Sequence, residues 1–388
     1  MGNIITYVQE KGHLAFDELG FNEVDSLILS ELSYLSYEGW VNHPVAFDMT
    51  IGKLRAAGFP ASRPSNDYSP DRCEQLFQAL AGSRRFRDVG VNFFDSEIDP
   101  REEKQFAAVT FRLSPRLHYI AYRGTDNTFV GWKEDLNMSF LEDIPAQKSA
   151  VAYLERMAER MRSTWILGGH SKGGNLAVYA GMSAPPKLQR DVALIYDHDG
   201  PGFLDRVLQR PGFQAIQDRI YKTVPESAVV GLLLAEHEQY TIVESDAKAI
   251  MQHDPFSWQV ENGEFVRAQD TDLLSKTTDR TLNHWLSTMD DGARRTFVDA
   301  LYGLIQATGA TTLPELTENW RGNIPSVYFA IRQMDPEIRK ALFETVGGLV
   351  RASGESVWEM LDERLAQTRE DVRNDFIERF QRWKDARE

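Results

Sequence analysis

The chain has 388 residues, of which 42% are hydrophobic and 26% charged, so it is long enough for a globular protein with more than one domain's worth of core. Its 58 Asp and Glu residues exceed its 43 Lys and Arg residues, and the net charge of −15 argues against nucleic acid or an anionic membrane surface as a partner. The single cysteine, Cys73, excludes an internal disulfide framework and a cysteine-rich metal site and favours a reducing, cytoplasmic setting. We expect no stable membrane anchor, because every apolar run is far shorter than the ~20 residues of a membrane span. We also expect no cofactor and no metal.

The first hundred residues are predicted to be mostly helical. Asn22 and Asp25 have the spacing of a helix N-cap pair, and residues 24–35 then place apolar side chains on one helical face. Residues 60–70, rich in proline and serine, are predicted to form a loop, and residues 71–81 a further helix.

From residue 105 the pattern changes to strands that alternate with helices. Residues 105–113 and 117–123 are rich in β-branched and aromatic side chains and predict a hairpin. Further strands are predicted at 165–167, 191–196, 219–224 and 240–244, with helices at 146–161, 175–180 and 203–209. This alternation predicts an α/β fold, specifically a mostly parallel sheet flanked by helices.

The end of the chain is predicted to be helical. Asn262-Gly263 between two short apolar segments predicts a tight hairpin that closes the α/β region. Beyond residue 271, helical spacing relates two groups of apolar residues: Phe297, Leu301, Leu304 and Ile305, and then Leu361, Leu365, Val372, Phe376 and Phe380. We therefore divide the chain into an α/β domain, residues 1–270, and a helical C-terminal region, residues 271–388, which we expect to act as a cap.

The stretch that carries chemistry is Gly169-x-Ser171-x-Gly173, between the strand at 165–167 and the helix at 175–180. This is the G-x-S-x-G pattern of a nucleophile elbow. A serine at the tip of such a turn has strained backbone geometry, and the residues two positions away must be small. The turn also places the Lys172 amide beside the serine oxygen, where negative charge develops during acyl transfer.

A nucleophilic serine needs a histidine base, which follows the serine in the chain order of this fold. Four histidines do so: His198, His237, His253 and His284. We favour His253, because it comes shortly after the last predicted strand. His198, which also follows a strand, is the second choice, and His237 lies in an acidic run and is expected in solvent.

Three carboxylates are candidates for the acid that orients the base. Asp199 ends the strand after the elbow helix and is followed by Gly-Pro-Gly, Glu226 follows the next strand, and Asp197 is the third choice. For each of them the alternative is a cap or turn carboxylate, a common use of Asp beside Gly and Pro. We favour Asp199.

The second donor to the oxyanion is expected from a loop after an earlier strand. Gly124-Thr125 fits, since glycine permits close backbone approach and Thr125 offers an amide and a hydroxyl. Thr125 and Lys172 are therefore the predicted oxyanion hole. Trp132, a few residues later, is expected to be buried at the start of a helix.

These motifs together resemble the class 3, or fungal-type, lipases. The residues that carry the likeness are Tyr122-Arg123-Gly124-Thr125, Trp132-x-x-Asp135 and Gly169-His170-Ser171-Lys172-Gly173-Gly174. More closely, the chain resembles an uncharacterised bacterial lipase-like family known as a domain of unknown function. Its hallmarks stand here as Phe21–Asp25, Arg123–Asp126, Gly131–Asp135, Gly169–Asn175, Asp199–Phe203 and Gln252–Phe256, so that the likeness covers residues 1–267.

The resemblance implies an α/β-hydrolase fold with Ser171 as nucleophile, Thr125 in the oxyanion hole and His253 as base. Two features depart from the class 3 pattern. Lys172 replaces the usual leucine, and we expect its cation at the mouth of the pocket, where it would favour a negatively charged head group. The region in which those lipases carry their acid contains Glu226 and no aspartate. Either Asp199 takes this role or the triad is incomplete.

The sequence therefore predicts a serine hydrolase that cleaves a carboxylic ester through an acyl-enzyme intermediate, of the lipase, esterase or lysophospholipase kind. An acyl lipid or lysophospholipid as the substrate rests on analogy with the family. The alternative is a non-catalytic binding or scaffold protein of the same fold with an incomplete triad.

Overall fold

The computed structural model describes residues 2–61, 70–269, 271 and 290–309 and the single positions 331, 332, 336 and 339, without positions 42, 45, 127, 229 and 235–239. Contacts divide the chain into two units, Met1–Arg339 and Lys340–Glu388, and every described residue belongs to the first. The boundary predicted at residue 270 adjoins residues 272–289, which lie outside the described part.

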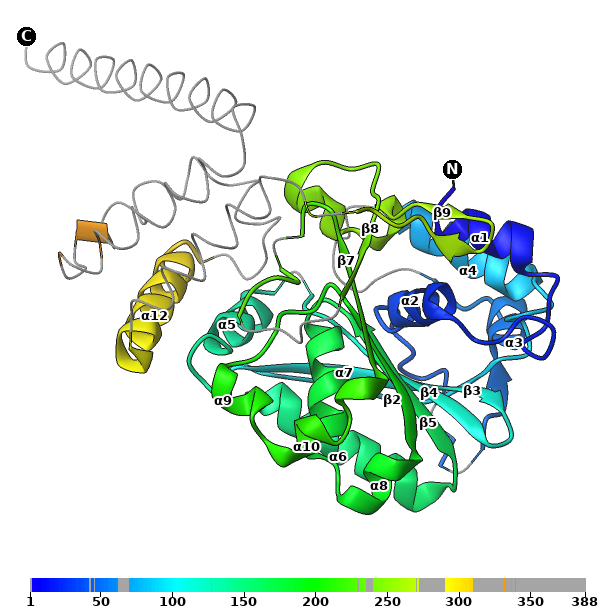
Figure 1. The fold of residues 1–388 in the computed structure, drawn as a ribbon, viewed down its shortest axis with the longest axis horizontal. Helices are drawn as coiled ribbons and strands as arrows, with labels where there is room; N and C mark the ends of the chain where they lie inside the picture. The colour runs from blue at the N-terminus through cyan, green and yellow to red at the C-terminus, as the bar shows by residue number, and fades with distance from the viewer. Residues whose placement is uncertain are drawn as a thin grey trace, which may run out of the picture. The chain divides into compact units, whose positions relative to one another are not determined.

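An eight-stranded mixed sheet forms the centre of the first unit, and its strands lie in chain order (Figure 1). The strands are β1 (Met49–Thr50), β2 (Gly90–Asp99), β3 (Lys104–Ser114), β4 (Leu117–Tyr122), β5 (Thr164–His170), β6 (Val192–His198), β7 (Ile220–Pro225) and β8 (Tyr240–Val243). Neighbours from β1 to β4 are antiparallel and those from β4 to β8 parallel. The predicted α/β class, with a mostly parallel sheet flanked by helices, is confirmed.

Strand β2 lies within the first hundred residues, which the sequence predicts to be mostly helical, and no strand was predicted there. The pairing of β2 with β3 shifts between Asn92 and Asp95, and Phe93 has a positive φ of 57°. A bulge of this kind interrupts the alternation of inward and outward side chains, which is the pattern that predicts a strand.

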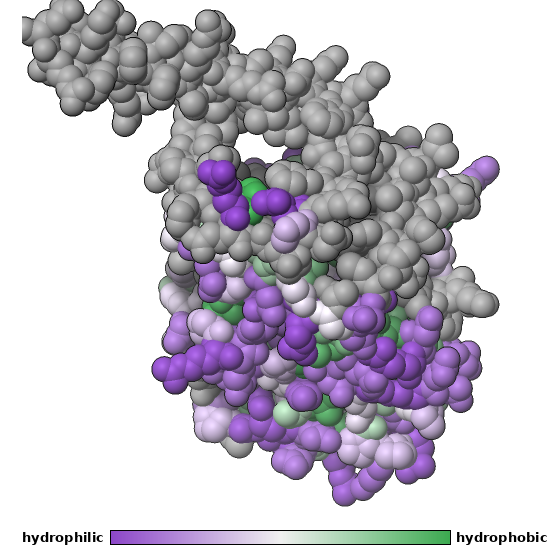
Figure 2. Space-filling view, turned by 90° about the vertical axis from the view of Figure 1, so that its left-hand side faces the viewer, coloured by the Kyte–Doolittle hydropathy of each residue, from purple (hydrophilic) through white to green (hydrophobic). Residues whose placement is uncertain are grey.

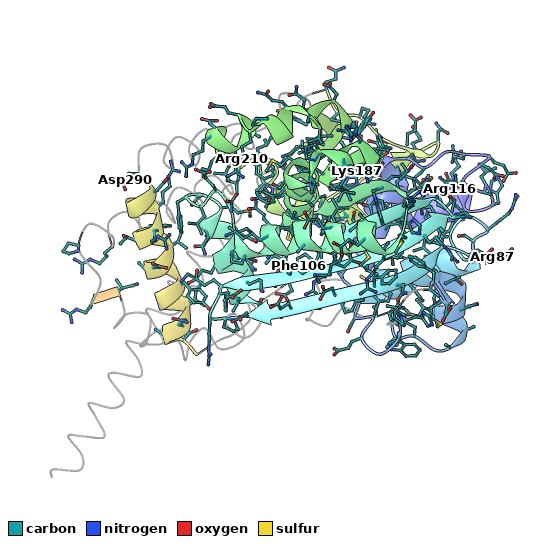
Figure 3. The ribbon with its side chains drawn as sticks, turned by 90° about the horizontal axis from the view of Figure 1, so that it is seen from below. Arg87, Phe106, Arg116, Lys187, Arg210 and Asp290 are labelled. Carbon is teal, nitrogen blue, oxygen red and sulfur yellow. The ribbon has the colours of Figure 1, made fainter. Side chains whose placement is uncertain are left out.

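Helices cover both faces of the sheet. One face carries α1 (Ile4–Lys11), α2 (Glu23–Leu32), α3 (Ile51–Ala56) and α4 (Pro70–Gly82). The other carries α6 (Pro145–Arg160), α7 (Lys172–Ser183), α8 (Pro186–Asp191) and α10 (Pro211–Gln214). Along β4, Tyr119 packs into the first layer and Ile120 into the second, as a period of two requires. Figure 3 shows the second layer from below, where Phe106 of β3 contributes to the core beneath α6.

The predicted cap of α2 is confirmed. The Asn22 side chain accepts hydrogen bonds from Val24 N and Asp25 N, and Asp25 Oδ2 accepts one from Asn22 N. The helix ends at Leu32, short of the predicted face. Asp25 also forms a fully buried ion pair with Arg85, which joins the start of α2 to the chain after α4.

The remaining described elements are short, apart from α12. They are α5 (Phe129–Asn137), α9 (Asp205–Leu208), the 3-10 helices η1 (Gln217–Arg219), η2 (Ala249–His253) and η3 (Pro255–Ser257), strands β9 (Val260–Glu261) and β10 (Glu264–Phe265), and α12 (Asp291–Ala307). Asn262 and Gly263 have φ values of 56° and 94° between β9 and β10, which confirms the predicted tight hairpin. Helix α12 contains the first predicted apolar group, whereas Leu361, Leu365, Val372, Phe376 and Phe380 lie outside the described residues.

No helix in the described part of the chain is long and apolar enough to cross a bilayer. The described surface in Figure 2 is mostly hydrophilic, with small apolar areas scattered over it.

Candidate active site

Ser171 lies at the tip of the turn between β5 and α7 and has left-handed backbone dihedral angles, φ 58° and ψ −135°. The flanking glycines permit this turn. A Cβ atom on Gly173 would collide with the Tyr122 carbonyl, and one on Gly169 would collide with the backbone of Gly173. The structure therefore holds this serine in the strained geometry of a nucleophile elbow.

His253 and Asp199 meet next to this turn. His253 ends η2, Asp199 follows β6, and Nδ1 of the histidine lies 2.6 Å from Oδ2 of the aspartate. The Asp199 side chain is 1% exposed and that of His253 is 26% exposed. Because an ionised carboxylate only accepts hydrogen bonds, Nδ1 carries the proton and Nε2 keeps its lone pair for use as a base.

The surrounding backbone fixes Asp199. Its φ is 53°, its amide donates to the Thr223 carbonyl at 2.8 Å, and its Oδ1 accepts the Gly231 amide at 3.1 Å. A Cβ atom on Gly231 would collide with this Oδ1. Both oxygens of the carboxylate are thus engaged, one by the loop and one by His253.

His170 links His253 to the elbow. Its Nε2 donates to the His253 carbonyl at 2.9 Å, and the two imidazole rings lie 4.5 Å apart. Its Nδ1 lies 3.3 Å from the Tyr34 hydroxyl and 3.8 Å from Oε1 of Glu31. Since His170 directly precedes Ser171, these contacts keep His253 beside the serine. Sequence reasoning missed His170 and Tyr34. The one signal in the sequence was that His170 lies inside the G-x-S-x-G motif.

Within the described residues, the Ser171 hydroxyl makes no hydrogen bond to His253. Such bonds are often long in free enzymes and shorten when substrate binds.

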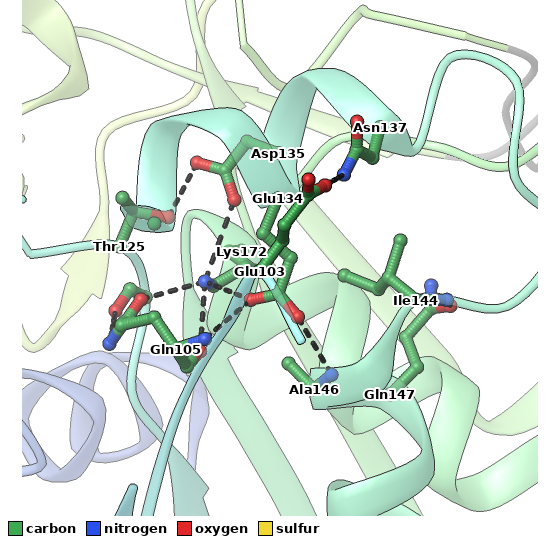
Figure 4. A network of polar contacts seen from close by, with 12 residues as sticks. Glu103, Gln105, Thr125, Glu134, Asp135, Asn137, Ile144, Ala146, Gln147 and Lys172 are labelled. Atoms are coloured by element: carbon green, nitrogen blue, oxygen red, sulfur yellow. Dashed lines mark hydrogen bonds and ion pairs between the residues drawn. The ribbon is translucent and has the colours of Figure 1, made fainter. Parts of the chain in front are cut away.

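The loop after β4 passes directly beside the elbow. A Cβ atom on Gly124 would lie 3.1 Å from the Ser171 Cβ and 2.6 Å from the His170 carbonyl oxygen, so only glycine fits there. The next residue, Thr125, donates its hydroxyl proton to Oδ2 of Asp135 on α5 (Figure 4). The Asp135 side chain is 32% exposed, but its Oδ1 is out of contact with solvent, and this desolvation raises the pKa of Asp135 to about 6 against the opposing effect of the Lys172 ammonium.

The Lys172 side chain does not lie at a pocket mouth, so that prediction is wrong. Its side chain is 0% exposed, and its Nζ donates to the Gln105 carbonyl at 3.0 Å, to Gln105 Oε1 at 2.7 Å and to Glu134 Oε2 at 3.0 Å. The carboxylates of Glu134 and Asp135 draw the ammonium inward (Figure 4). Only the amide of Lys172, in the first residue of α7, is left for the predicted oxyanion hole.

The alternative acids occupy other places. Asp197 is buried, accepts the Gly200 amide at 2.9 Å and pairs with Lys222 Nζ at 3.5 Å. Burial raises the pKa of Asp197 to about 6. Glu226 lies in the turn after β7, and Nδ1 of His253 is taken by Asp199.

His198, the second choice for the base, is a core residue. Its side chain is fully buried and its Nε2 lies 2.9 Å from Ser26 Oγ, under α2. Burial lowers the pKa of His198 to about 3, so it stays neutral. His237 and His284 lie outside the described residues.

Trp132 is 42% exposed, contrary to the predicted burial. The inward face of α5 is instead occupied by Lys133, Glu134 and Asn137, which make polar contacts beneath the helix. Among the described residues, no group of three or more His, Cys, Asp or Glu is placed to hold a metal ion.

Solved structures similar to this chain include fungal lipases. A fungal lipase in complex with an inhibitor is 14% identical, over 62% of this chain and 77% of that one, with a TM-score of 0.34. The lipase of Rhizopus microsporus var. chinensis is 16% identical, over 44% and 64%, with a TM-score of 0.31. The M37 lipase is 12% identical, over 68% and 80%, with a TM-score of 0.34. At these scores the likeness carries no argument about activity.

A comparison with curated proteins finds no match to this chain. The sequence model of the Mbeg1-like family matches residues 80–303, which include every residue of the site described above except Tyr34 and Ser26. Since this match spans more than half of the sequence, the chain belongs to the Mbeg1-like family.

Proposed function

We propose that this protein is a serine hydrolase that cleaves a carboxylic ester. In this proposal Ser171 is the nucleophile, His253 the general base and acid, and Asp199 the residue that orients the imidazole. The amides of Thr125 and Lys172 stabilise the oxyanion.

The reaction has two halves. Ser171 Oγ attacks the ester carbonyl carbon while His253 Nε2 takes its proton, and the resulting oxyanion accepts hydrogen bonds from the two amides. The tetrahedral intermediate then breaks its bond to the alcohol oxygen, which leaves with the proton from His253. Water next attacks the acyl-enzyme by the same route, and the products are a carboxylic acid and free Ser171.

One observation carries the proposal: the 2.6 Å contact between His253 and Asp199 beside a serine with φ 58°. Two non-glycine residues with left-handed backbone, Ser171 and Asp199, belong to one small site. Strain of this kind persists only where the surrounding structure enforces it, and it concentrates at functional sites.

For the substrate we propose an acyl lipid or lysophospholipid, on the strength of the sequence resemblance. Burial of the Lys172 ammonium removes the argument for an anionic head group. The cytoplasmic setting stays a prediction.

The test is covalent labelling by a fluorophosphonate probe, together with hydrolysis of p-nitrophenyl acyl esters. We expect the wild type and Ser96→Ala, which changes an exposed serine of β2, to take the label and to turn over ester. Ser171→Ala should lose both activities. Folded wild-type protein that takes no label and cleaves no ester at pH 7–8 would contradict the proposal and favour a non-catalytic binding protein.

A further inference from the structure

The residue directly after the nucleophile carries a buried positive charge. Lys172 Nζ has three N–H donors, and the structure gives it three acceptors, namely the carbonyl and Oε1 of Gln105 and Oε2 of Glu134. The Lys172 and Glu134 side chains are both 0% exposed. Burial of an ammonium this complete costs free energy of desolvation, which only nearby negative charges and hydrogen-bond acceptors can offset.

The surroundings hold more negative than positive charge. Glu134 accepts the Ala146 amide at 2.8 Å with Oε1 and the Gln105 amide at 3.0 Å with Oε2, so it joins β3, α6 and α7. Asp135 accepts the Thr125 hydroxyl with Oδ2, while its Oδ1 is out of contact with solvent and has no hydrogen-bond donor among the described residues. Lys172 Nζ, at 3.6 Å, is the cation nearest to this oxygen. Two carboxylates thus share one cation (Figure 4).

We propose that Lys172 is a positioning residue of the active site, whose ammonium keeps Asp135 ionised and so fixes Thr125 beside the elbow. The inference rests on the proposed function, because it assigns to Lys172 control over the oxyanion donor of that reaction. Its path is short: Lys172 acts on Asp135, Asp135 holds the Thr125 hydroxyl, and Thr125 follows Gly124, which packs on Ser171.

Removal of the ammonium would change the protonation of Asp135. The charged groups that face Asp135 are Lys172 from α7 and Glu134 from its own helix. Without the lysine, two carboxylates remain without a cation, and one of them takes up a proton. Glu134 keeps two amide donors that favour its charged form, whereas Asp135 has an oxygen without a donor. Asp135 therefore takes the proton, and the Thr125 hydroxyl loses its ionised acceptor.

The first test compares Lys172→Met with Lys133→Met. Lys133 is a matched control, since it is also nearly buried and pairs with two carboxylates, but these are Glu103 and Asp299 and not Glu134 and Asp135. We expect Lys172→Met to lower kcat about 10²-fold at pH 7, in the range of a lost oxyanion donor, with KM changed by less than about twofold. A 10²-fold loss at pH 7 through protonation requires Asp135 to be about 99% protonated, so the acidic limb of kcat should move upward by about three pH units from the wild-type pKa of about 6. Lys133→Met should keep the wild-type profile.

The second test restores the charge count. In Lys172→Met/Glu134→Gln one carboxylate remains and the cluster again carries a single negative charge, as in the wild type. We expect this variant to fold, the acidic limb to return to within about half a unit of wild type, and kcat to recover at least about tenfold. If Lys172→Met is too unstable to assay, a double variant that folds but departs from these bounds overturns the inference.

The outcomes separate the two proposals. If the wild type is active and labelled, but Lys172→Met shows an unchanged kcat and pH profile, the inference is wrong and the proposed function stands. The inference is also wrong if the double variant folds but stays as inactive as Lys172→Met, since the lysine then acts by packing. If folded wild type neither takes the label nor cleaves ester, the proposed function fails, and the catalytic role of Lys172 fails with it.

Discussion

Two regions of this molecule each bury an ion pair completely, and they differ in how the charges are balanced. At the start of α2, Arg85 faces one carboxylate, Asp25, and donates its other protons to the carbonyls of Leu19 at 2.7 Å and Gly20 at 2.9 Å. Asp25 also accepts the Tyr7 hydroxyl at 2.9 Å. This pair is neutral, and its hydrogen-bonding groups are used.

Beside the elbow, Lys172 faces two carboxylates, and Oδ1 of Asp135 is left without a donor. Burial alone therefore does not tell what an ion pair is for, because a buried pair is in itself weak evidence for stability. The balance of charge and the completeness of the hydrogen bonds distinguish a pair that fixes the fold from one that controls a site. The predictions below test this distinction.

The largest effect is expected at Asp199, a buried carboxylate whose partner is half-buried. Asp199→Asn should lower kcat about 10⁴-fold, because the asparagine amide, unlike the carboxylate, does not hold the imidazole in the tautomer whose Nε2 is unprotonated. Steady-state hydrolysis of a p-nitrophenyl ester measures this. Asp197→Asn, a change two residues away at an equally buried carboxylate that pairs with Lys222, should change kcat less than tenfold. Full activity in Asp199→Asn together with loss in Glu226→Gln would refute the assignment.

The Arg85–Asp25 pair should act on stability instead. Asp25→Ala leaves a buried guanidinium without its carboxylate and should lower the free energy of unfolding by about 3–5 kcal/mol. Urea denaturation measures this loss, and kcat per folded molecule should not change. Asp17→Ala, at an exposed position nearby, should stay within about 0.5 kcal/mol of wild type. A fall in kcat for folded Asp25→Ala would remove the distinction between the two regions.

A third buried polar group, His198, carries no charge. Its folded-state pKa is lowered to about 3, so near pH 5 the unfolded chain binds a proton that the folded chain does not. Stability is therefore lost as the pH falls below about 6.5, by about 2 kcal/mol between pH 7 and pH 5 for this residue. In His198→Gln, the fall in the free energy of unfolding between pH 7 and pH 5, measured by urea denaturation, should be smaller than in wild type by that amount. In His13→Gln, a change at an exposed histidine, this fall should equal that of wild type. An unchanged difference in His198→Gln would show that this histidine is not the cause.

The smallest effect concerns the cap of α2. Asn22→Ala removes the acceptor for two amides at the helix start and should cost about 1 kcal/mol, seen as a lower urea midpoint. Asn22→Ser keeps an acceptor and should recover most of this loss. If Asn22→Ala lowers the free energy of unfolding as much as Asp25→Ala does, then Asp25 stabilises the fold through the capping box and not through its pairing with Arg85.

The sequence predicts best those features that depend on residues close together in the chain. The strands from β3 to β8, the α2 cap and the glycines of the elbow all follow from residues a few positions apart. The fate of the Lys172 side chain does not, because its acceptors lie 38 and 67 residues away in the sequence. The contact of His253 with Asp199, across 54 residues, was one of three alternatives open to sequence reasoning. Charge, burial and long-range contact decide such cases, and they exist only in the folded chain.

The strand order has a consequence for synthesis of the protein. Because β1 to β8 lie side by side in chain order, each strand leaves the ribosome after the strand on which it docks. Ser171 is thus made long before its proposed base, His253, which follows the last strand of the sheet. The N-terminus closes this last piece: Gly2 pairs with Val260, and the Asn3 side chain donates to the Phe256 carbonyl at 3.1 Å. Residues 2 and 3 can make these contacts only after residues 256–260 have been made, and a chain released before residue 253 would carry the elbow without its proposed base.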